Sequence, residues 1–371
     1  MIELIRKLIE LVHGKLPKQN HAVIYGWPNY EDNTLALEAA LCNSDLNQVI
    51  ILVSGHPPQT PQGFGNKTIQ IRKNSFMGLW LFLRAKYVFF THPCFVRDFP
   101  DDVISVNVWH GMPIKRIGRM LERQMDIPSS HALATSPFWK DIMQQSMPPK
   151  EEILITGLPR NDFLFTQKSS VSNLLELENS ERLVAWLPTY RRSVRGELRE
   201  DGTDYENIFE MPDVDPVCLN RNLKELNSIL WIKPHPMAPS LSAREWSNIR
   251  IVDEKSLRQE GLSLYQLLSA SELLITDISS VLIDFLLTDK PVIHAFPDIE
   301  QYKSSRGFSV EPIEDYFAGE VVSNQDELLK ALEVELSGKD PHAEKRRALR
   351  DLSHTHQDNK STERLLKAVG L

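Results

Sequence analysis

The stretch ELLITDISSVLIDFLLTDKPVIHAF, residues 272–296, indicates the fold class. Its first six and its last six residues are short apolar runs, and such runs are typical of buried strands. Residues 279–288 lie between them; they begin with two serines and continue as an apolar run, which is typical of a capped helix. A strand, a helix and a second strand in this order predict a βαβ unit with parallel strands.

The same alternation of strands and helices extends over the rest of the chain. The other expected strands are residues 21–26, 48–55, 86–92, 103–110, 152–157, 183–188, 229–236 and 249–253. The other expected helices are residues 33–42, 137–147, 216–227 and 263–270. Continuous Val, Ile and Phe runs are typical of parallel strands that are covered on both faces. The pattern therefore predicts an α/β fold of two doubly wound, Rossmann-like domains that face each other across a ligand cleft.

A polar stretch at residues 166–182 separates the two halves and is the expected hinge. We therefore expect one Rossmann-like domain at residues 1–170 and a second at residues 171–371. The last residues, 338–371, are charged and are expected to be helical. Their apolar stripe, which includes Leu352, makes them a candidate to pack back on the first domain.

The composition is that of an ordinary soluble protein. The chain has 371 residues, 42% of them hydrophobic, which is enough apolar material to form cores and argues against global disorder. With 42 Lys+Arg against 50 Asp+Glu, the net charge of −8 argues against a general nucleic-acid binder. Three widely spaced cysteines offer neither a disulfide framework nor a CxxC zinc site, which fits a reducing, cytoplasmic compartment.

The N-terminal residues 1–16 have apolar residues at helical spacing and interleaved charges, unlike a signal peptide. The apolar residues are Ile2, Ile5, Leu8, Ile9 and Val12. Two alternatives follow: the helix docks on the core of the protein, or it lies on a membrane surface where nearby basic residues meet anionic lipid. No run approaches the length that a membrane span needs.

Conspicuous polar residues follow the expected strands, where open α/β sheets bind ligands. His110 ends one strand, and Gly111 permits a tight turn after it. We expect Pro113 to start a helix that carries Lys115, with Arg116 and Arg119 beyond it. A histidine beside such a basic segment is typical of a general base near an anion, and equally of a hydrogen-bonded structural histidine.

Three further clusters follow strands of the second half. Arg191 comes first in an arginine-rich loop that could hold a diphosphate or be solvated. Lys233 and His235 alternate at a strand end and therefore project to one face. Ser279 and Ser280 stand at the first turn of the helix that follows Asp277, with Asp284 one turn later; they are typical of an anion site or of ordinary capping.

Several functions are excluded by missing motifs. GxxxxGK[ST] is absent, which argues against a P-loop ATPase, and no GxGxxG follows the first strand, which weakens a dinucleotide dehydrogenase. GxSxG and HExxH are also absent, and the histidines and carboxylates show no metal-ligand spacing. We therefore expect no metal site.

Taken in order, the clusters resemble the CDP-glycerol glycerophosphotransferase family, the teichoic-acid and capsule-type polyol-phosphate transferases. The matching pieces are YEDNTLAL (30–37), NVWHGMPIKRIG (107–118), GLPRNDFL (157–164), WLPTYR (186–191), IKPHP (232–236), LLITDISSVLIDF (273–285) and PDIEQYKSSRGF (297–308). The resemblance implies a GT-B fold and transfer of glycerol phosphate, or a similar polyol phosphate, from a CDP-activated donor to a hydroxyl, with release of CMP.

The resemblance also implies roles for residues. The implied catalytic residues are His110, as the base, and His235. The implied donor and phosphate-binding residues, on the second domain, are Thr189, Arg191, Lys233, Asp277, Ser279, Ser280 and Asp284. The implied acceptor residues, mostly on the first domain, are Gly111, Lys115, Arg160 and Arg306. CDP-glycerol or another CDP-polyol is then the substrate, no cofactor is required, and the acceptor is a saccharide or polyol-phosphate end, with a lipid-linked one as a candidate.

The alternatives are a GT-B glycosyltransferase with a nucleotide-sugar donor, a sugar-nucleotide epimerase, and a silent nucleotide-binding partner of a capsule complex. The expected location is the cytoplasm, with the inner face of the cell membrane as a candidate site of peripheral attachment. We expect no nucleic-acid partner.

Overall fold

The computed structural model of the protein describes residues 2–55, 65–122, 124–166, 170–177, 181–189, 205, 207–234 and 246–371. Contacts divide the chain into two compact units. Unit 1 comprises Met1–Pro113, Ile117–Phe165 and Ser353–Leu371, and unit 2 comprises Ile114–Arg116 and Thr166–Leu352. The chain thus changes unit at Thr166, near the expected boundary at residue 170, and its last nineteen or so residues return to unit 1.

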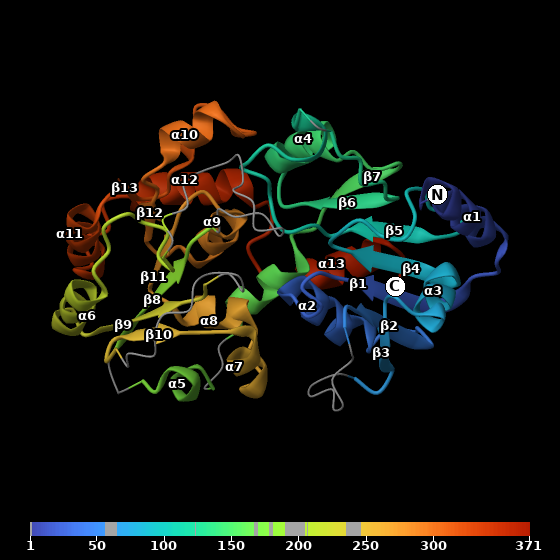
Figure 1. The fold of residues 1–371 in the computed structure, drawn as a ribbon, viewed down its shortest axis with the longest axis horizontal. Coiled ribbons are helices and arrows are strands. Elements are labelled where there is room, and N and C mark those ends of the chain that lie inside the picture. The colour runs from blue at the N-terminus through green and yellow to red at the C-terminus, as the bar shows by residue number, and fades with distance from the viewer. Residues whose placement is uncertain are drawn as a thin grey trace. The chain divides into compact units, whose positions relative to one another are not determined.

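Unit 1 is built on a seven-stranded parallel sheet with the order β3-β2-β1-β4-β5-β6-β7 (Figure 1). Its strands are β1 Gln19–Tyr25, β2 Gln48–Val53, β3 Thr68–Arg72, β4 Ala85–Phe90, β5 Ile104–Asn107, β6 His131–Ala134 and β7 Glu152–Ile155. Its helices are α1 Ile2–Lys15, α2 Asp32–Leu41, α3 Phe76–Leu83, η1 Gly118–Met120, α4 Pro137–Ser146, η2 Pro159–Phe165 and α13 Ser361–Ala368. The strand order reverses between β1 and β4, which makes this point the switch point where such sheets bind ligands.

Unit 2 has a six-stranded parallel sheet with the order β10-β9-β8-β11-β12-β13. Its strands are β8 Arg182–Leu187, β9 Ser228–Ile232, β10 Ile249–Ile251, β11 Leu273–Thr276, β12 Val292–Ala295 and β13 Glu320–Val322. Its helices are α5 Ser170–Leu175, α6 Pro216–Glu225, α7 Glu254–Gln259, α8 Leu264–Ala270, α9 Ser280–Phe285, η3 Leu286–Thr288, α10 Ile299–Ser304, η4 Ile313–Tyr316, α11 Gln325–Leu336 and α12 Ala343–Ser353. Here the order reverses between β8 and β11.

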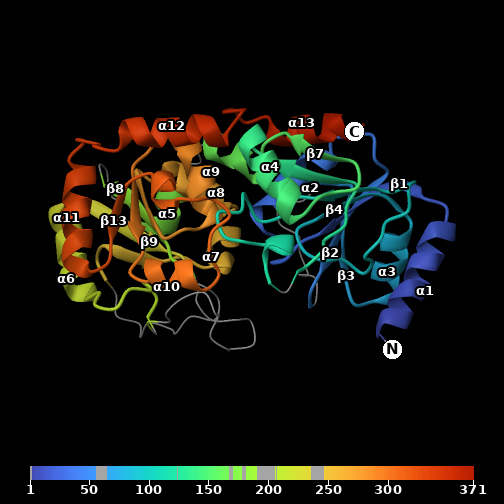
Figure 2. The ribbon, with the colours of Figure 1, turned by 90° about the horizontal axis from the view of Figure 1, so that it is seen from above.

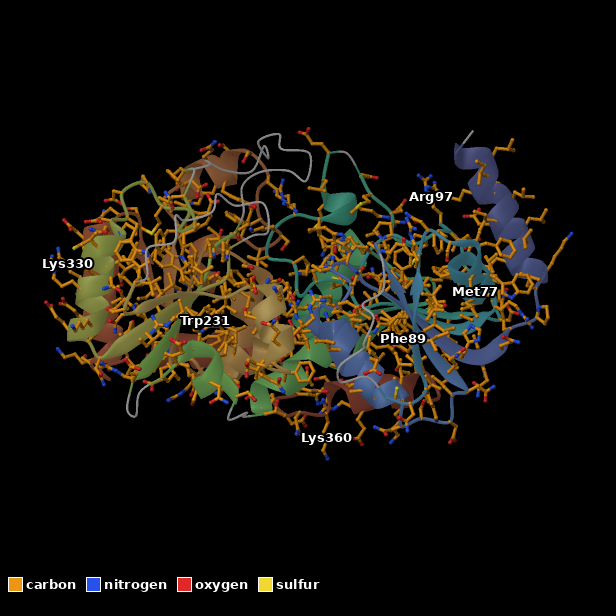
Figure 3. All side chains as sticks on the ribbon, turned by 60° about the horizontal axis from the view of Figure 1, so that its bottom comes forward. Met77, Phe89, Arg97, Trp231, Lys330 and Lys360 are labelled. Carbon is orange, nitrogen blue, oxygen red and sulfur yellow. The ribbon has the colours of Figure 1, made fainter. Side chains whose placement is uncertain are left out.

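Each sheet carries the core of its unit. Phe89 in β4 and Trp231 in β9 are fully buried, whereas Lys330 and Lys360 lie at the surface (Figure 3). In unit 2, α6 and α11 lie side by side (Figures 1 and 2); α6 packs against β9 and α11 against β12 and β13, and the leucines of both helices belong to one buried cluster. The predicted α/β class with two doubly wound parallel sheets is therefore confirmed.

One expectation about local structure was wrong. No helix starts at Pro113: Ile114–Arg116 is extended, and Lys115 pairs antiparallel with Phe308. Two backbone bonds hold this pairing, from the Arg116 amide to the Gly307 carbonyl (3.3 Å) and from the Ser309 amide to the Ile114 carbonyl (2.9 Å). Residues 307–309 therefore provide the backbone hydrogen bonds that neighbouring residues would provide in a helix.

Several residues of the apolar stripes at the two ends of the chain are exposed. Ile5, Leu8 and Val12 on α1 are 51%, 60% and 38% exposed, so these residues do not dock on the core. Near the other terminus, Leu352 on α12 is 42% exposed and does not belong to the buried stripe. Within the described part of the chain, no helix is both long and apolar enough to cross a membrane.

Candidate functional site

The switch point of unit 2 brings together Thr189, just beyond β8, and Asp277, just beyond β11. The register pairs Thr276 with Leu187, so the two following segments leave the sheet together. Thr189 Oγ1 donates a hydrogen bond to Asp277 Oδ1 (2.6 Å), and Lys115 Nζ donates to Thr189 Oγ1 (3.3 Å). Lys115 also lies over the ring of Tyr302, 5.0 Å from its centroid. The predicted residues Thr189, Asp277 and Lys115 therefore form one connected group.

His294 supports this group from inside the sheet, although the sequence did not single it out. Its Nδ1 lies 3.1 Å from the carbonyl oxygen of Asp277, and its Nε2 accepts a hydrogen bond from the amide of Ala318 (3.0 Å). Because Nε2 accepts, the proton of a neutral ring stands on Nδ1 and is donated to Asp277. Burial lowers the pKa of His294 to about 4, so the ring is neutral at pH 7.

The serines at the start of α9 differ from the carboxylate that follows them. Ser279 is the N-cap residue, yet its side chain makes no capping hydrogen bond, and both Ser279 and Ser280 are half-buried. Asp284 is fully buried, and its Oδ2 accepts a hydrogen bond from the phenol of Tyr265 (2.5 Å). Asp284 therefore joins α8 to α9 from within, whereas the two serines are partly exposed.

Four other predicted residues lie in the second half of the chain: Lys233 and Arg191 for the donor, His235 as a catalytic residue and Arg306 for the acceptor. Lys233 forms an ion pair with Glu254 (2.9 Å), with only 17% of the lysine side chain exposed. Arg306 Nε donates to the carbonyl of Arg116 (3.1 Å) and thereby supports the extended segment that carries Lys115. Arg191 and His235 lie outside the described residues.

In unit 1, His110 lies beyond the carboxyl end of β5. The preceding Trp109 adopts a left-handed conformation (φ 54°), and its amide donates to Asn107 Oδ1 (3.1 Å), which turns the chain out of the strand. Arg160, carried by η2, donates through Nη2 to the carbonyl of His110 (2.9 Å). The imidazole ring meets that of His92 edge to face, with the centroids 4.2 Å apart.

Burial and nearby positive charge both act on the His110 imidazole. Burial is the larger effect, and it acts with the charges of His92 and Arg160 to lower the pKa of His110 to about 3. The ring is therefore neutral at pH 7 and holds a nitrogen lone pair that can accept a proton. Gly111, the next residue, is buried and has a φ of 112°, a conformation that favours glycine.

Hydrogen bonds through Arg160 also link the first turn of α2 to the segment around His110. Glu31 caps this helix by accepting hydrogen bonds from the amides of Thr34 (2.9 Å) and Asn33 (3.1 Å). Burial raises the pKa of Glu31 to about 7, although the charge of Arg160 opposes this rise. Asn33 Oδ1 in turn accepts the amide of Arg160 (3.1 Å), so α2, η2 and the segment around His110 are joined.

Sequence reasoning missed His92 and Glu31, which follow β4 and β1 at the switch point. His92 obeys the rule that led to His110, because it stands two residues beyond the carboxyl end of β4, whereas Glu31 lies six residues beyond β1 as the N-cap of α2. Among the described residues, no group of three His, Cys, Asp or Glu side chains could hold a metal ion. The neutral imidazole of His110 beside the buried Arg160 makes proton transfer the candidate chemistry of unit 1.

A comparison with known proteins identifies relatives of the chain. The chain is 26% identical to the teichoic acid ribitol-phosphate polymerase TarK of Staphylococcus aureus over 80% of this chain and 58% of that protein. It is 24% identical to a teichoic acid ribitol-phosphate primase of Bacillus spizizenii over 74% of this chain and 71% of that protein. The match to TarL of S. aureus covers 37% of that protein, so the chain spans less than two thirds of the length of both TarK and TarL.

A solved structure of the wall teichoic acid polymerase TagF shares the fold, with a TM-score of 0.78 and 18% identity over 100% of this chain and 92% of that chain. The predicted GT-B-like fold class is thereby confirmed. The model of the CDP-glycerol:poly(glycerophosphate) glycerophosphotransferase family matches residues 8–371. The chain therefore belongs to the CDP-glycerol:poly(glycerophosphate) glycerophosphotransferase family.

Proposed function

We propose that the protein transfers a polyol phosphate, with glycerol phosphate as the first choice, from a CDP-activated donor to a hydroxyl of a teichoic-acid-like or other cell-surface polymer. Family membership supports this, as do relatives named for glycerol-phosphate and ribitol-phosphate transfer. The observation that carries the proposal is His110, a neutral histidine at the carboxyl edge of the sheet, held by Arg160.

In the proposed reaction, the acceptor hydroxyl oxygen attacks the distal phosphorus of the donor diphosphate. An imidazole nitrogen of His110 takes the hydroxyl proton as the new P–O bond forms. The bond between the distal phosphorus and the bridging oxygen breaks, and its electron pair leaves with CMP. A bound anion next to His110 raises the pKa of its imidazole, so the histidine becomes a stronger base when the substrates are present.

On the donor side, Lys115 and the hydroxyls of Thr189, Ser279 and Ser280 would bind the phosphates. The ammonium group of Lys115 donates a hydrogen bond to the Thr189 hydroxyl, and Asp277 orients that hydroxyl by accepting its proton in a second hydrogen bond. The remaining assignments stay predictions. We propose that the donor is also bound by Lys233, Arg191 and His235, and that Asp284 supports α9. We propose that the acceptor is bound by Gly111, Arg160 and Arg306. Lys115 could bind either substrate.

In this scheme, protein cations rather than a metal ion or cofactor neutralise the phosphates. Activity that persists after EDTA treatment and dialysis would support this part of the proposal. Activity that returns only when a divalent cation is added would contradict it.

We further propose that the protein lies on the inner face of the membrane through α1, where a lipid-linked acceptor would be presented. Leu4, Leu8 and Leu11 on this helix are 75%, 60% and 56% exposed. Helix α3 lies beside α1, because His13 packs against Phe82 with ring centroids 5.7 Å apart (Figures 1 and 2). It adds further exposed apolar side chains, those of Phe76, Met77 and Trp80. Apolar helix faces of this kind bind membrane surfaces, most strongly when basic residues flank them.

Co-sedimentation with phosphatidylglycerol vesicles tests this attachment. The wild-type protein should sediment with the vesicles, and Leu8→Glu should reduce the bound fraction. Leu352→Glu, an equally polar change at an exposed leucine of unit 2, should not. Equal binding of all three proteins would refute the role of α1.

The activity is tested by CMP release from CDP-glycerol, with a polyol-phosphate acceptor, for the wild type and for His110→Ala. We expect acceptor-dependent CMP release that falls by ~10²–10⁴-fold in the variant, as the loss of a general base predicts. His110→Asn, which keeps a polar side chain, serves as a second variant, and circular dichroism checks that both are folded. CMP release at the wild-type rate from both variants would refute the assignment of His110. Turnover of a nucleotide sugar instead of any CDP-polyol would indicate the glycosyltransferase alternative.

A further inference from the structure

A buried lysine stands at the carboxyl edge of the unit 1 sheet, close to the switch point. Lys73 directly follows β3 and is only 9% exposed. Its ammonium group lies over the ring of Tyr25, the last residue of β1, at 4.1 Å from the centroid. No carboxylate of the described residues lies within ion-pair distance of it, and residues 56–64, which precede β3, contain neither Asp nor Glu. A buried charge without an opposite charge lowers the stability of the fold, which points to a functional role for Lys73.

His92 lies between Lys73 and the candidate base His110 in its interactions: the charge of Lys73 acts on His92, and the ring of His92 contacts that of His110. In the sheet order β3-β2-β1-β4-β5, Lys73, His92 and His110 follow the carboxyl ends of β3, β4 and β5, and Tyr25 is the last residue of β1. The rings of His92 and His110 are in contact, with centroids 4.2 Å apart. Burial and the charge of Lys73 together lower the pKa of His92 to about 4, so the lysine acts electrically on this histidine.

His92 is held in a way that leaves it able to bind a ligand. Its Nδ1 lies 3.2 Å from Thr91 Oγ1, and that oxygen also accepts the amide of Trp27 (3.2 Å). The ring is half-buried, and the neighbouring Trp27 side chain is 41% exposed and packs against it at 5.4 Å between centroids. A fixed imidazole and an exposed indole therefore meet at the switch point, and the buried ammonium group of Lys73 lies over the ring that ends β1 in the same sheet.

We propose that Lys73 and His92 form a subsite that binds the phosphate group of the acceptor, with the reacting hydroxyl of that acceptor at His110. The proposal rests on the proposed function and deepens it, because it selects a phosphate-bearing acceptor over a neutral saccharide. A phosphate anion supplies the opposite charge that Lys73 lacks among the described residues. The same anion favours protonation of His92, which then donates a second charge-assisted hydrogen bond.

The matched control is Lys86, which lies in the same unit. Lys86 stands near the amino end of β4, is exposed, and lies over the ring of Tyr87 at 5.3 Å. Lys73→Met and Lys86→Met therefore each remove one positive charge and one lysine–tyrosine contact. Only Lys73→Met removes a charge from the carboxyl edge of the sheet. Lys73→Arg restores the charge and tests for rescue.

Two measurements distinguish the subsite from the reaction. The first is calorimetric binding of glycerol 3-phosphate, with glycerol as the uncharged probe, which requires no turnover. We expect Lys73→Met to weaken glycerol 3-phosphate binding by about 10- to 100-fold, the usual effect of one charge-assisted hydrogen bond. His92→Gln should weaken binding less, and Lys73→Arg and Lys86→Met should bind nearly as the wild type does.

The second measurement is the KM for a matched pair of acceptors, one ending in a polyol phosphate and one in the free polyol, followed by CMP release. Lys73→Met should raise the KM for the phosphate-ended acceptor about 10-fold and leave the KM for the donor unchanged. Binding loss without any CMP release from the wild type would support the subsite and count against the proposed function. Binding of glycerol 3-phosphate equal in wild type and Lys73→Met, or a KM raised equally for both acceptors, would overturn the inference.

Discussion

Replacing Asp162 by alanine tests how the last helix of the chain holds the residues around His110. Asp162 lies in η2, two residues after Arg160, whose guanidinium donates to the His110 carbonyl. Its carboxylate accepts hydrogen bonds from the amides of Ser361 (2.8 Å) and Thr362 (2.9 Å) and from the Thr362 hydroxyl (2.6 Å). The side chain therefore caps α13 and fastens it to the element that carries Arg160.

The magnitude follows from burial at this junction. Ser361 and Thr362 are only 3% and 5% exposed, so the change leaves two buried amides without their acceptor. Each lost partner costs about 1–3 kcal/mol, and loss of a helix N-cap costs about 0.5–2 kcal/mol. Burial also raises the pKa of Asp162, which shows that desolvation offsets part of the benefit of its charge. We therefore expect a loss of roughly 2–3 kcal/mol in the free energy of opening α13 from η2.

Hydrogen exchange followed by mass spectrometry measures this opening locally. Peptides from η2 and α13 should exchange ~30- to ~200-fold faster in Asp162→Ala, whereas peptides from β8 in unit 2 should not change. Asp358→Ala is the control, because Asp358 lies just before α13 and pairs with Arg364 on that helix, but its side chain is 45% exposed. We expect it to cost less than about 1 kcal/mol. Equal exchange in the two variants would refute the claim that Asp162 fastens α13 to η2.

Three further outcomes are expected. Burial lowers the pKa of His294 to about 4, so below about pH 6.5 the unfolded state binds more protons than the folded state. The unfolding free energy of unit 2 should therefore fall by roughly 2–3 kcal/mol between pH 6.5 and pH 4. Urea titrations of His294→Gln should show a weaker dependence on pH. Tyr265→Phe removes the phenol that donates to the buried Asp284 carboxylate and should lower the unfolding free energy of unit 2 by about 2 kcal/mol, seen as an earlier urea midpoint. Gly118→Ala should lower the melting temperature, because Gly118 has a φ of 56° and a Cβ there would overlap a backbone carbonyl oxygen, whereas Gly14→Ala meets nothing within 4 Å and should raise it slightly.

The fold could be predicted from continuous apolar runs, and the errors occur where such runs are missing. The strand β3 has mainly half-buried residues and includes Gln70, so it has no apolar run. The strand β6 has the sequence HALA, in which two of four residues are alanine, and β13 has only three residues. Short or partly exposed strands are stabilised by their neighbours in the sheet, and a single sequence does not show those neighbours.

The same limit explains the helix expected after Pro113. A proline followed by basic residues favours a helix start, but Ile114–Arg116 instead pairs with residues 307–309. That pairing joins segments about 190 residues apart, as the bond from Arg306 to Arg116 also shows. No local pattern could indicate it.

The candidate site was predictable wherever a polar residue directly followed a clear strand. His110 and Asp277 satisfy this rule, and each lies at or next to the point where the strand order of its sheet reverses. His92 satisfies it too, at the end of β4, but no basic cluster follows it in the sequence. Lys73 was hidden because its strand was not recognised, and His294 because a histidine inside a buried strand gives no functional signal.

The motif NVWHGMPIKRIG at residues 107–118 looks like a single site in the sequence, yet its residues serve two units. His110 belongs to unit 1, where Arg160 and His92 surround it. Lys115 belongs to unit 2, where it contacts Thr189 and Tyr302. The short spacing between the two residues therefore reflects a chain that crosses from one unit to the other, not a helix that presents both side chains on one face. In the function we propose, this one motif supplies both the proton acceptor, His110, and a phosphate-binding cation, Lys115.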